Sequence, residues 1–190
     1  MTEKKRFSFE FFPPKTDVGR EKLKNVRAEL NKLGPDFFSV TYGAGGSTRD
    51  NTKDIVLAMT AEGISTAPHL SFGSDEEDSI LALIKEYKNA GINRIVALRG
   101  DMPSGMGAQR LVFANELVEF IRRETGDHFH LEVAAYPEIH PDADNYSQDI
   151  EFLKRKFEAG ADSAITQYFY NADAYLYFVD QCQKAGIDKP

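Results

Sequence analysis

The 190-residue sequence contains a single cysteine, Cys182, and no apolar run near the ~18 residues of a membrane span. One cysteine excludes an internal disulfide and is typical of a reducing cytosol. Acidic residues (30) outnumber basic residues (23), and the net charge of −7 argues against a nucleic-acid partner. Ser8 and Glu10 interrupt the apolar start, which makes a poor secretory signal. We expect a cytoplasmic globular protein that binds small molecules, not membranes or nucleic acids.

Several familiar functional motifs are missing as well. The sequence has no Walker A motif, and no Ser/His/Asp or Cys/His nucleophile pattern stands out. The glycine-rich stretch Gly43–Thr48 fails as a dinucleotide fingerprint, because Thr48 stands where the third glycine is required. Its backbone could still bind an anion weakly. His128 and His130 are spaced like a metal pair, but no cysteine or carboxylate cluster completes a site, so we expect no metal.

An internal repeat is the main positive feature of the sequence. Three segments share a helix end, a glycine, a short loop and an apolar run, and their glycines are Gly91, Gly160 and Gly186. Gly63 marks a weaker fourth copy. Glycine ends a helix cheaply because it adopts the left-handed backbone conformation. The repeat therefore predicts helices followed by buried strands.

Strand and helix patterns alternate six times along the chain. Short runs rich in β-branched and aromatic residues predict strands at 7–11, 37–41, 66–70, 94–98, 131–136 and 163–169. Apolar residues at steps of three and four predict the helices between them; examples are Leu117, Val118 and Ile121, and Tyr175, Phe178 and Cys182. Ser74 and Glu77 form a capping-box pattern for the third helix.

One polar residue stands near the end of each predicted strand. These residues are Glu10, Thr41, His69, Asp101, Tyr136 and Gln167, which follow one another at intervals of 31, 28, 32, 35 and 31 residues. So regular an interval favours a (β/α)8 TIM barrel over a doubly wound sheet, with about six of the eight β/α units present. Barrel enzymes carry their catalytic groups at the strand carboxyl ends, so the six residues should meet at one rim.

Glu10 is the strongest catalytic candidate among them. It stands among four phenylalanines in Phe7–Pro14, where loss of hydration should raise the pKa of the carboxyl and suit it to general-acid work. The alternative is that strand alternation simply turns Glu10 toward solvent.

The other candidates each have a structural alternative. Asp101 is either a second carboxylate at the rim, with Arg99 beside it for an anion, or a turn residue after Gly100. His69 and His140 are site histidines or hydrogen-bonded structural residues. Lys156 belongs to a solvated helix face or turns toward a phosphate. Taken alone, these residues predict a barrel enzyme with an acid on its first strand and an anionic ligand, and they do not name the reaction.

Six segments in order resemble the methylenetetrahydrofolate reductase family. They are Phe7–Thr16 (FSFEFFPPKT), Ser39–Ala44 (SVTYGA), Ala67–Leu70 (APHL), Ile95–Asp101 (IVALRGD), Ala134–Pro141 (AAYPEIHP) and Ala164–Phe169 (AITQYF). The resemblance implies one catalytic FAD-binding barrel domain over residues 1–190. It also implies an oxidoreductase of one-carbon and methionine metabolism, in which NADH or NADPH reduces FAD and 5,10-methylenetetrahydrofolate becomes 5-methyltetrahydrofolate.

The resemblance also assigns roles to residues. Glu10 and Asp101 match catalytic residues that contact folate, and Gln167 matches a further folate contact. Positions that line FAD in the family correspond to Thr41, His69, Arg99, Gly100, Asp101, Ala114, Tyr136, His140, Asp149 and Lys156. Family members form homo-oligomers, so we expect the same of the full-length protein.

The sequence departs from the family pattern at its end. The residues after Gly186 resemble the approach to a seventh strand, and strands seven and eight are absent from the sequence. Two alternatives therefore stay open beside the reductase. One is a truncated, non-catalytic flavin- or folate-binding fragment. The other is a flavin barrel acting on a different substrate, such as a proline-dehydrogenase-like enzyme.

Overall fold

A computed structural model describes residues 6–42, 49–73, 75–99 and 113–190, and in them strands and helices alternate throughout. The elements are β1 (Ser8–Phe11), α1 (Asp17–Asn31), β2 (Phe37–Val40), α2 (Arg49–Ala61), β3 (Thr66–Leu70), α3 (Glu77–Asn89), β4 (Arg94–Ala97), α4 (Ala114–Thr125), β5 (His130–Ala135), α5 (Tyr146–Glu158), β6 (Ser163–Thr166) and α6 (Ala172–Lys184). The predicted alternation is confirmed.

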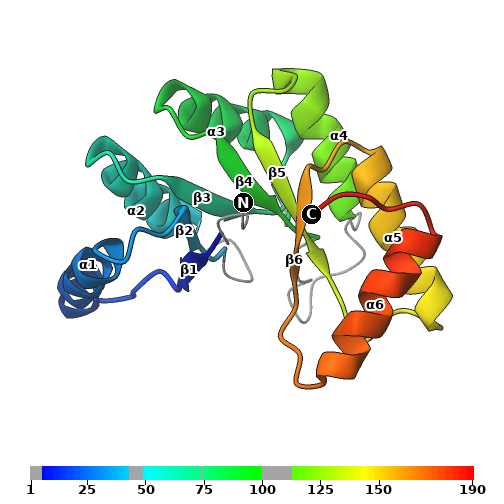
Figure 1. The fold of residues 1–190 in the computed structure, drawn as a ribbon. Coiled ribbons are helices and arrows are strands. Elements are labelled where there is room, and N and C mark those ends of the chain that lie inside the picture. The colour runs from blue at the N-terminus through cyan, green and yellow to red at the C-terminus, as the bar shows by residue number, and fades with distance from the viewer. Residues whose placement is uncertain (1–5, 43–48, 74, 100–112) are drawn as a thin grey trace, which may run out of the picture.

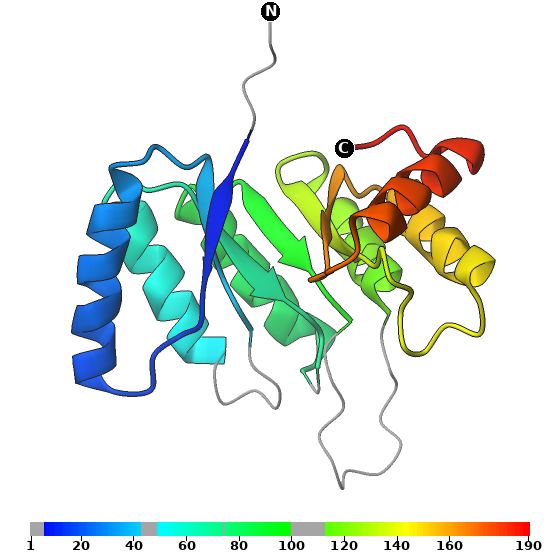
Figure 2. The ribbon, with the colours of Figure 1, turned by 60° about the horizontal axis from the view of Figure 1, so that its bottom comes forward.

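The strands form one curled parallel sheet in the order β1-β2-β3-β4-β5-β6. The helices lie along its outer, convex side, and the sheet curves around an open inner side (Figure 1). Figure 2 shows the same layer of helices from a second direction. This is the arrangement of a partial TIM barrel, with six of the expected eight units in the described part of the chain.

Strand alternation divides the side chains between the two faces of the sheet. The convex face is apolar: Phe38, Val40, Leu70, Ile95 and Leu131 are almost fully buried against the helices. The helices contribute the apolar faces that the sequence predicted, among them Leu117 and Ile121 on α4 and Phe178 and Cys182 on α6. Tyr175, predicted on the same face of α6, is 37% exposed.

Two local predictions about element ends are wrong by more than one residue, while the other predicted strands agree with the observed ones to within one residue at each end. Helix α3 begins at Glu77 after the N-cap residue Glu76, so Glu77 cannot be the third residue of a capping box; Ser74 lies outside the described residues. Strand β6 ends at Thr166, not at residue 169. Past that point the Gln167 side chain accepts a hydrogen bond from the Tyr168 N–H (3.0 Å), and the partner strand β5 has already ended at Ala135, which pairs with Thr166.

The two outer strands keep one side open within the described residues. β1 pairs with β2, and β6 pairs with β5. Among the described residues, only Pro190 bonds to the outer side of β6, where its carbonyl accepts a hydrogen bond from the Ala164 N–H (2.9 Å). Large exposed apolar side chains gather in the same two end units, and examples are Phe12 (79% exposed) and Tyr170 (84%).

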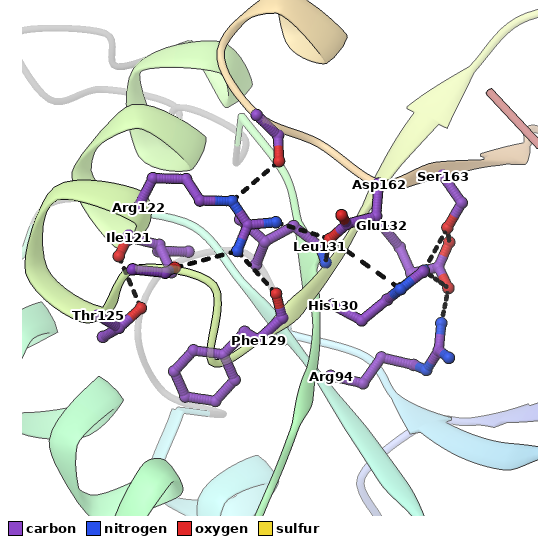
Figure 3. A network of polar contacts seen from close by, with 12 residues as sticks. Arg94, Ile121, Arg122, Thr125, Phe129, His130, Leu131, Glu132, Asp162 and Ser163 are labelled. Atoms are coloured by element: carbon purple, nitrogen blue, oxygen red, sulfur yellow. Dashed lines mark hydrogen bonds and ion pairs between the residues drawn. The ribbon is translucent and has the colours of Figure 1, made fainter. Parts of the chain in front are cut away.

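Arg122 on α4 ties three elements together at the amino ends of the strands (Figure 3). Its guanidinium donates to the Gly160 carbonyl (2.9 Å), to the Phe129 carbonyl (2.7 Å) and to Asp162 Oδ2 (2.6 Å). Asp162 Oδ2 also accepts from the Leu131 N–H (2.7 Å). One side chain therefore fixes the starts of β5 and β6 relative to α4.

We expect the R122M substitution to destabilise the protein by about 2 kcal/mol, because it leaves several partly buried acceptors without a hydrogen-bond donor. The matched control is R123M, since Arg123 is 62% exposed and should shift the free energy of unfolding by less than about 0.5 kcal/mol. Urea unfolding followed by circular dichroism measures both. Equal losses in the two variants would contradict this role for Arg122.

Candidate functional site

The described candidate residues lie at the carboxyl ends of the strands or on the helices that follow them. Glu10 and His69 lie near the ends of β1 and β3, and Thr41, Arg99, Tyr136 and Gln167 come just after β2, β4, β5 and β6. Ala114 is the first residue of α4, and Asp149 and Lys156 lie on α5. Gly100, Asp101 and the stretch Gly43–Thr48 fall outside the described residues.

Glu10 and His69 come together across the intervening strand β2. His69 Nε2 lies 3.2 Å from Glu10 Oε2, close enough for an ion pair, although the two atoms are poorly aligned for a hydrogen bond. The His69 side chain is 9% exposed and that of Glu10 is 49% exposed. The sequence predicted either a desolvated Glu10 carboxyl or one turned simply toward solvent. Both predictions are incomplete, because the side chain is half exposed and has a specific partner.

The expected rise in the pKa of Glu10 is wrong for this structure. The contact with His69 is the largest influence and lowers the pKa of the Glu10 carboxyl. Partial burial acts in the opposite direction, and Ser39 lowers the pKa further. The neighbouring phenylalanines fail to desolvate the carboxylate because Phe9 and Phe11 point to the opposite face of the strand.

Lys156 anchors a second group of candidates at the end of β5. Its Nζ donates to the Ala134 carbonyl (2.8 Å) and lies 5.9 Å from the centre of the Tyr136 ring. Burial lowers the pKa of Lys156 to about 8; Asp149 opposes this shift, and Arg99 adds to it. Of the two alternatives for Lys156, the solvated helix face is wrong, because the amine turns back over the sheet.

Arg99 and His140 belong to the same group. Arg99 forms an ion pair with Asp142 (2.7 Å), and this contact lowers the pKa of the exposed Asp142 carboxyl. Asp149 Oδ2 accepts from the His140 N–H (3.0 Å), and the His140 ring meets the Tyr136 ring edge-on at 4.4 Å. The structure therefore brings together two cations and two aromatic rings beside the ends of β4 and β5.

The remaining described candidates have backbone roles or are buried. The Thr41 N–H donates to the Phe11 carbonyl (2.9 Å), and its carbonyl accepts from the Thr52 hydroxyl (2.8 Å). The Gln167 N–H donates to the Ala135 carbonyl (2.6 Å), which extends the β5–β6 pairing by one step. Ala114 is buried at the start of α4.

Sequence reasoning missed Ser39 and Asp142. Ser39 could have been found, because it precedes Thr41 by two residues and alternation places both on the same face of a strand. Asp142 pairs with an arginine 43 positions earlier in the chain, and no local pattern signals such a contact.

A buried polar network at the inner face of β4, β5 and β6 was also missed (Figure 3). Glu132 is 5% exposed and contacts Arg94 and the Ser163 hydroxyl. His130 Nε2 lies 2.7 Å from Ser163 Oγ, which resembles a nucleophile and its base. Ser163 donates its only proton to Glu132, however, so His130 must donate to Ser163 and does not activate it. The network is structural.

A polar pocket of about 340 Å³ lies at the amino ends of the strands, opposite the candidate site. It is lined by Asn93, Arg94, Arg122, Asp127, His128, Phe129, His130 and Asp162. His128 is not paired with His130 for a metal, since His128 Nε2 contacts the Ile92 carbonyl (3.1 Å). In the described part of the chain no cluster of metal-ligating side chains forms, and no helix is long and apolar enough to cross a membrane.

The buried amine of Lys156 predicts a pH dependence of stability. Its pKa falls from 10.5 in the unfolded chain to about 8 in the folded protein, so folding is penalised while the amine is charged. The penalty is complete below pH 8 and fades as the pH rises toward 10.5. Relative to K156M, the wild-type free energy of unfolding should therefore increase by about 3 kcal/mol across that range.

Urea unfolding at a series of pH values measures this difference. K154M, on the same helix, is the matched control and should keep the wild-type pH profile. Parallel profiles for wild type and K156M would show that the amine is not penalised by burial.

Comparisons with known proteins agree with these features. The family model "Methylenetetrahydrofolate reductase" matches residues 1–190. The chain is 44% identical over 182 residues to 5,10-methylenetetrahydrofolate reductase of Escherichia coli (strain K12), which covers 95% of this chain and 60% of that protein. It is 41% identical over 199 residues to methylenetetrahydrofolate reductase (NADH) 1 of Zea mays, which covers 97% of this chain and 34% of that protein.

Solved structures support the fold. A Clostridium thermocellum protein described as binding two copies of 5-methyl-5,6,7,8-tetrahydrofolic acid matches with a TM-score of 0.66 and 19% identity, covering 95% of this chain and 60% of that one. A deoxyribose phosphate aldolase from Aeropyrum pernix matches with a TM-score of 0.61 and 14% identity, covering 96% and 73%. This chain thus spans about 60% of the length of its bacterial relative, and it belongs to the methylenetetrahydrofolate reductase family.

Proposed function

We propose that this protein reduces 5,10-methylenetetrahydrofolate to 5-methyltetrahydrofolate, with NADH or NADPH as electron donor and FAD as bound cofactor. The family match along all 190 residues is the observation that carries the proposal. The protein would act in the cytoplasm, in one-carbon and methionine metabolism, as a homo-oligomer. Its domain would be the (β/α)8 barrel, to which residues 1–190 contribute six units.

The residues at the ends of β3, β4 and β5 suit an anionic flavin nucleotide. Arg99 and Lys156 supply positive charge, and the Arg99 guanidinium already forms an ion pair with a carboxylate, that of Asp142, at 2.7 Å. His69 Nε2 is buried without a well-aligned hydrogen-bond partner among the described residues. Thr41, Ala114, Tyr136, His140 and Asp149 would complete the cofactor contacts, with Gly100 and Asp101. When bound, FAD supplies the hydride chemistry.

Glu10 is the residue proposed to protonate the folate. Its carboxyl is half exposed on the concave face, so a substrate bound there could reach it. As general acid it would donate a proton to the folate ring nitrogen, which opens the five-membered ring and leaves an electrophilic one-carbon unit. Asp101 and Gln167 would hold the pterin, and Gln167 is exposed just beyond β6, where its side chain is accessible.

The E10Q variant separates this role from a structural one. Without a transferable proton, reduction of the folate should fall by about 10²–10⁴-fold, while reduction of the flavin by NADH should keep its rate. Anaerobic stopped-flow absorbance of the flavin measures each half-reaction by itself. Equal loss of both rates would show that Glu10 maintains the site and is not its acid.

Binding without turnover is the second candidate function. The open outer side of β6 favours it, because within the described residues only the Pro190 carbonyl contacts that side and no strand covers it beside Gln167. Flavin absorbance in the purified 190-residue protein, together with absence of both half-reactions, would support this candidate over the reductase. A protein that takes up no FAD would contradict both.

A further inference from the structure

Three neighbouring strands, β1, β2 and β3, each present a polar group on the concave face. Glu10 on β1 pairs in register with Ser39 on β2, and Ser39 pairs with Ala67 on β3. His69 follows Ala67 by two residues, so alternation turns it to the same face. The sheet therefore places Ser39 and His69 on one side of Glu10, and this position is fixed by backbone pairing.

His69 is held more firmly than the carboxylate that it contacts. Its side chain is 9% exposed, whereas that of Glu10 is 49% exposed. A buried ring on a central strand loses little freedom when it makes a contact, while an exposed glutamate side chain must give up rotamer freedom. The ring is thus suited to fix the carboxylate, 3.2 Å away, in one orientation.

We propose that His69 is a positioning residue for Glu10, which holds the carboxylate toward the concave face together with Ser39. The contact between His69 and Glu10 is argued from the geometry alone. Its importance for catalysis rests on the proposed reductase function. In this arrangement the contact with His69 favours the charged form of the Glu10 carboxyl. The described groups that face Glu10 are His69 on β3 and Ser39 on β2.

Carbon-13 NMR of the Glu10 carboxyl carbon tests the contact without any folate. The signal is assigned by its absence in E10Q, and its pH titration is compared between wild type and H69Q. Removal of the imidazole should move the Glu10 midpoint upward, because the largest influence that lowers it is lost. H128Q is the matched control, because His128 lies at the opposite end of the sheet. The Glu10 midpoint in H128Q should equal that in wild type. An unchanged midpoint in H69Q would overturn the proposal.

A reciprocal measurement protects the test against a variant that fails to fold. In E10Q the His69 ring should lose the carboxylate that lies 3.2 Å from its Nε2 atom, and its nitrogen-15 signal, read at one fixed pH, should change position. An unchanged His69 signal in E10Q would also overturn the proposal.

The kinetic consequence distinguishes this inference from the function itself. The folate half-reaction of H69Q should keep its rate to higher pH than that of wild type, since Glu10 stays protonated longer. If the Glu10 midpoint differs between wild type and H69Q but wild type reduces no folate, the proposed function is contradicted and the positioning role stands. Folate reduction with identical pH profiles in H69Q and wild type would sink the positioning role alone.

Discussion

The parallel register of six short strands is the constraint on which the rest of this structure depends. Because side chains alternate between the two faces, the same register that buries Phe38 and Val40 against the helices puts Ser39 beside Glu10 on the inner face. A slip of one residue would exchange the faces, exposing the core and burying the carboxylate. Packing of the apolar face and assembly of the polar site are therefore a single event in folding.

Most of the fold could be predicted from the sequence because its signals are local. Gly63, Gly91, Gly160 and Gly186 all adopt positive φ angles at helix ends, as the repeat predicted. The amino end of α3 could not be predicted the same way, because Ser74 and Glu77 fit a capping box by spacing while the helix begins at Glu77. The end of β6 at Thr166 coincides with the end of its partner β5 at Ala135, and strand propensity within 163–169 gives no signal of that limit.

The sequence predicted where the candidate residues lie in the fold, but not which side chains contact one another. Regular spacing placed Glu10, His69 and Tyr136 at one end of the sheet. Local sequence context added Arg99, His140 and Lys156, and the resemblance added Asp149. The pairing of Glu10 with His69 and of Arg99 with Asp142 could not be predicted, since each contact joins distant segments. The predicted direction of the shift in the Glu10 pKa was wrong for the same reason, because the shift depends on His69, two strands away.

The concentration of exposed apolar side chains in the first and last units has a consequence for how the protein behaves in solution. In the first unit Phe12 and Val18 are more than three-quarters exposed, and in the last Leu176 is 63% and Tyr170 is 84% exposed. Unpaired strand edges beside such surfaces favour contacts between molecules. Attraction between molecules should therefore be directional, running from edge to edge of the sheet, and the net charge of −7 opposes it most strongly at low ionic strength. Salt concentration thus becomes a control of colloidal stability.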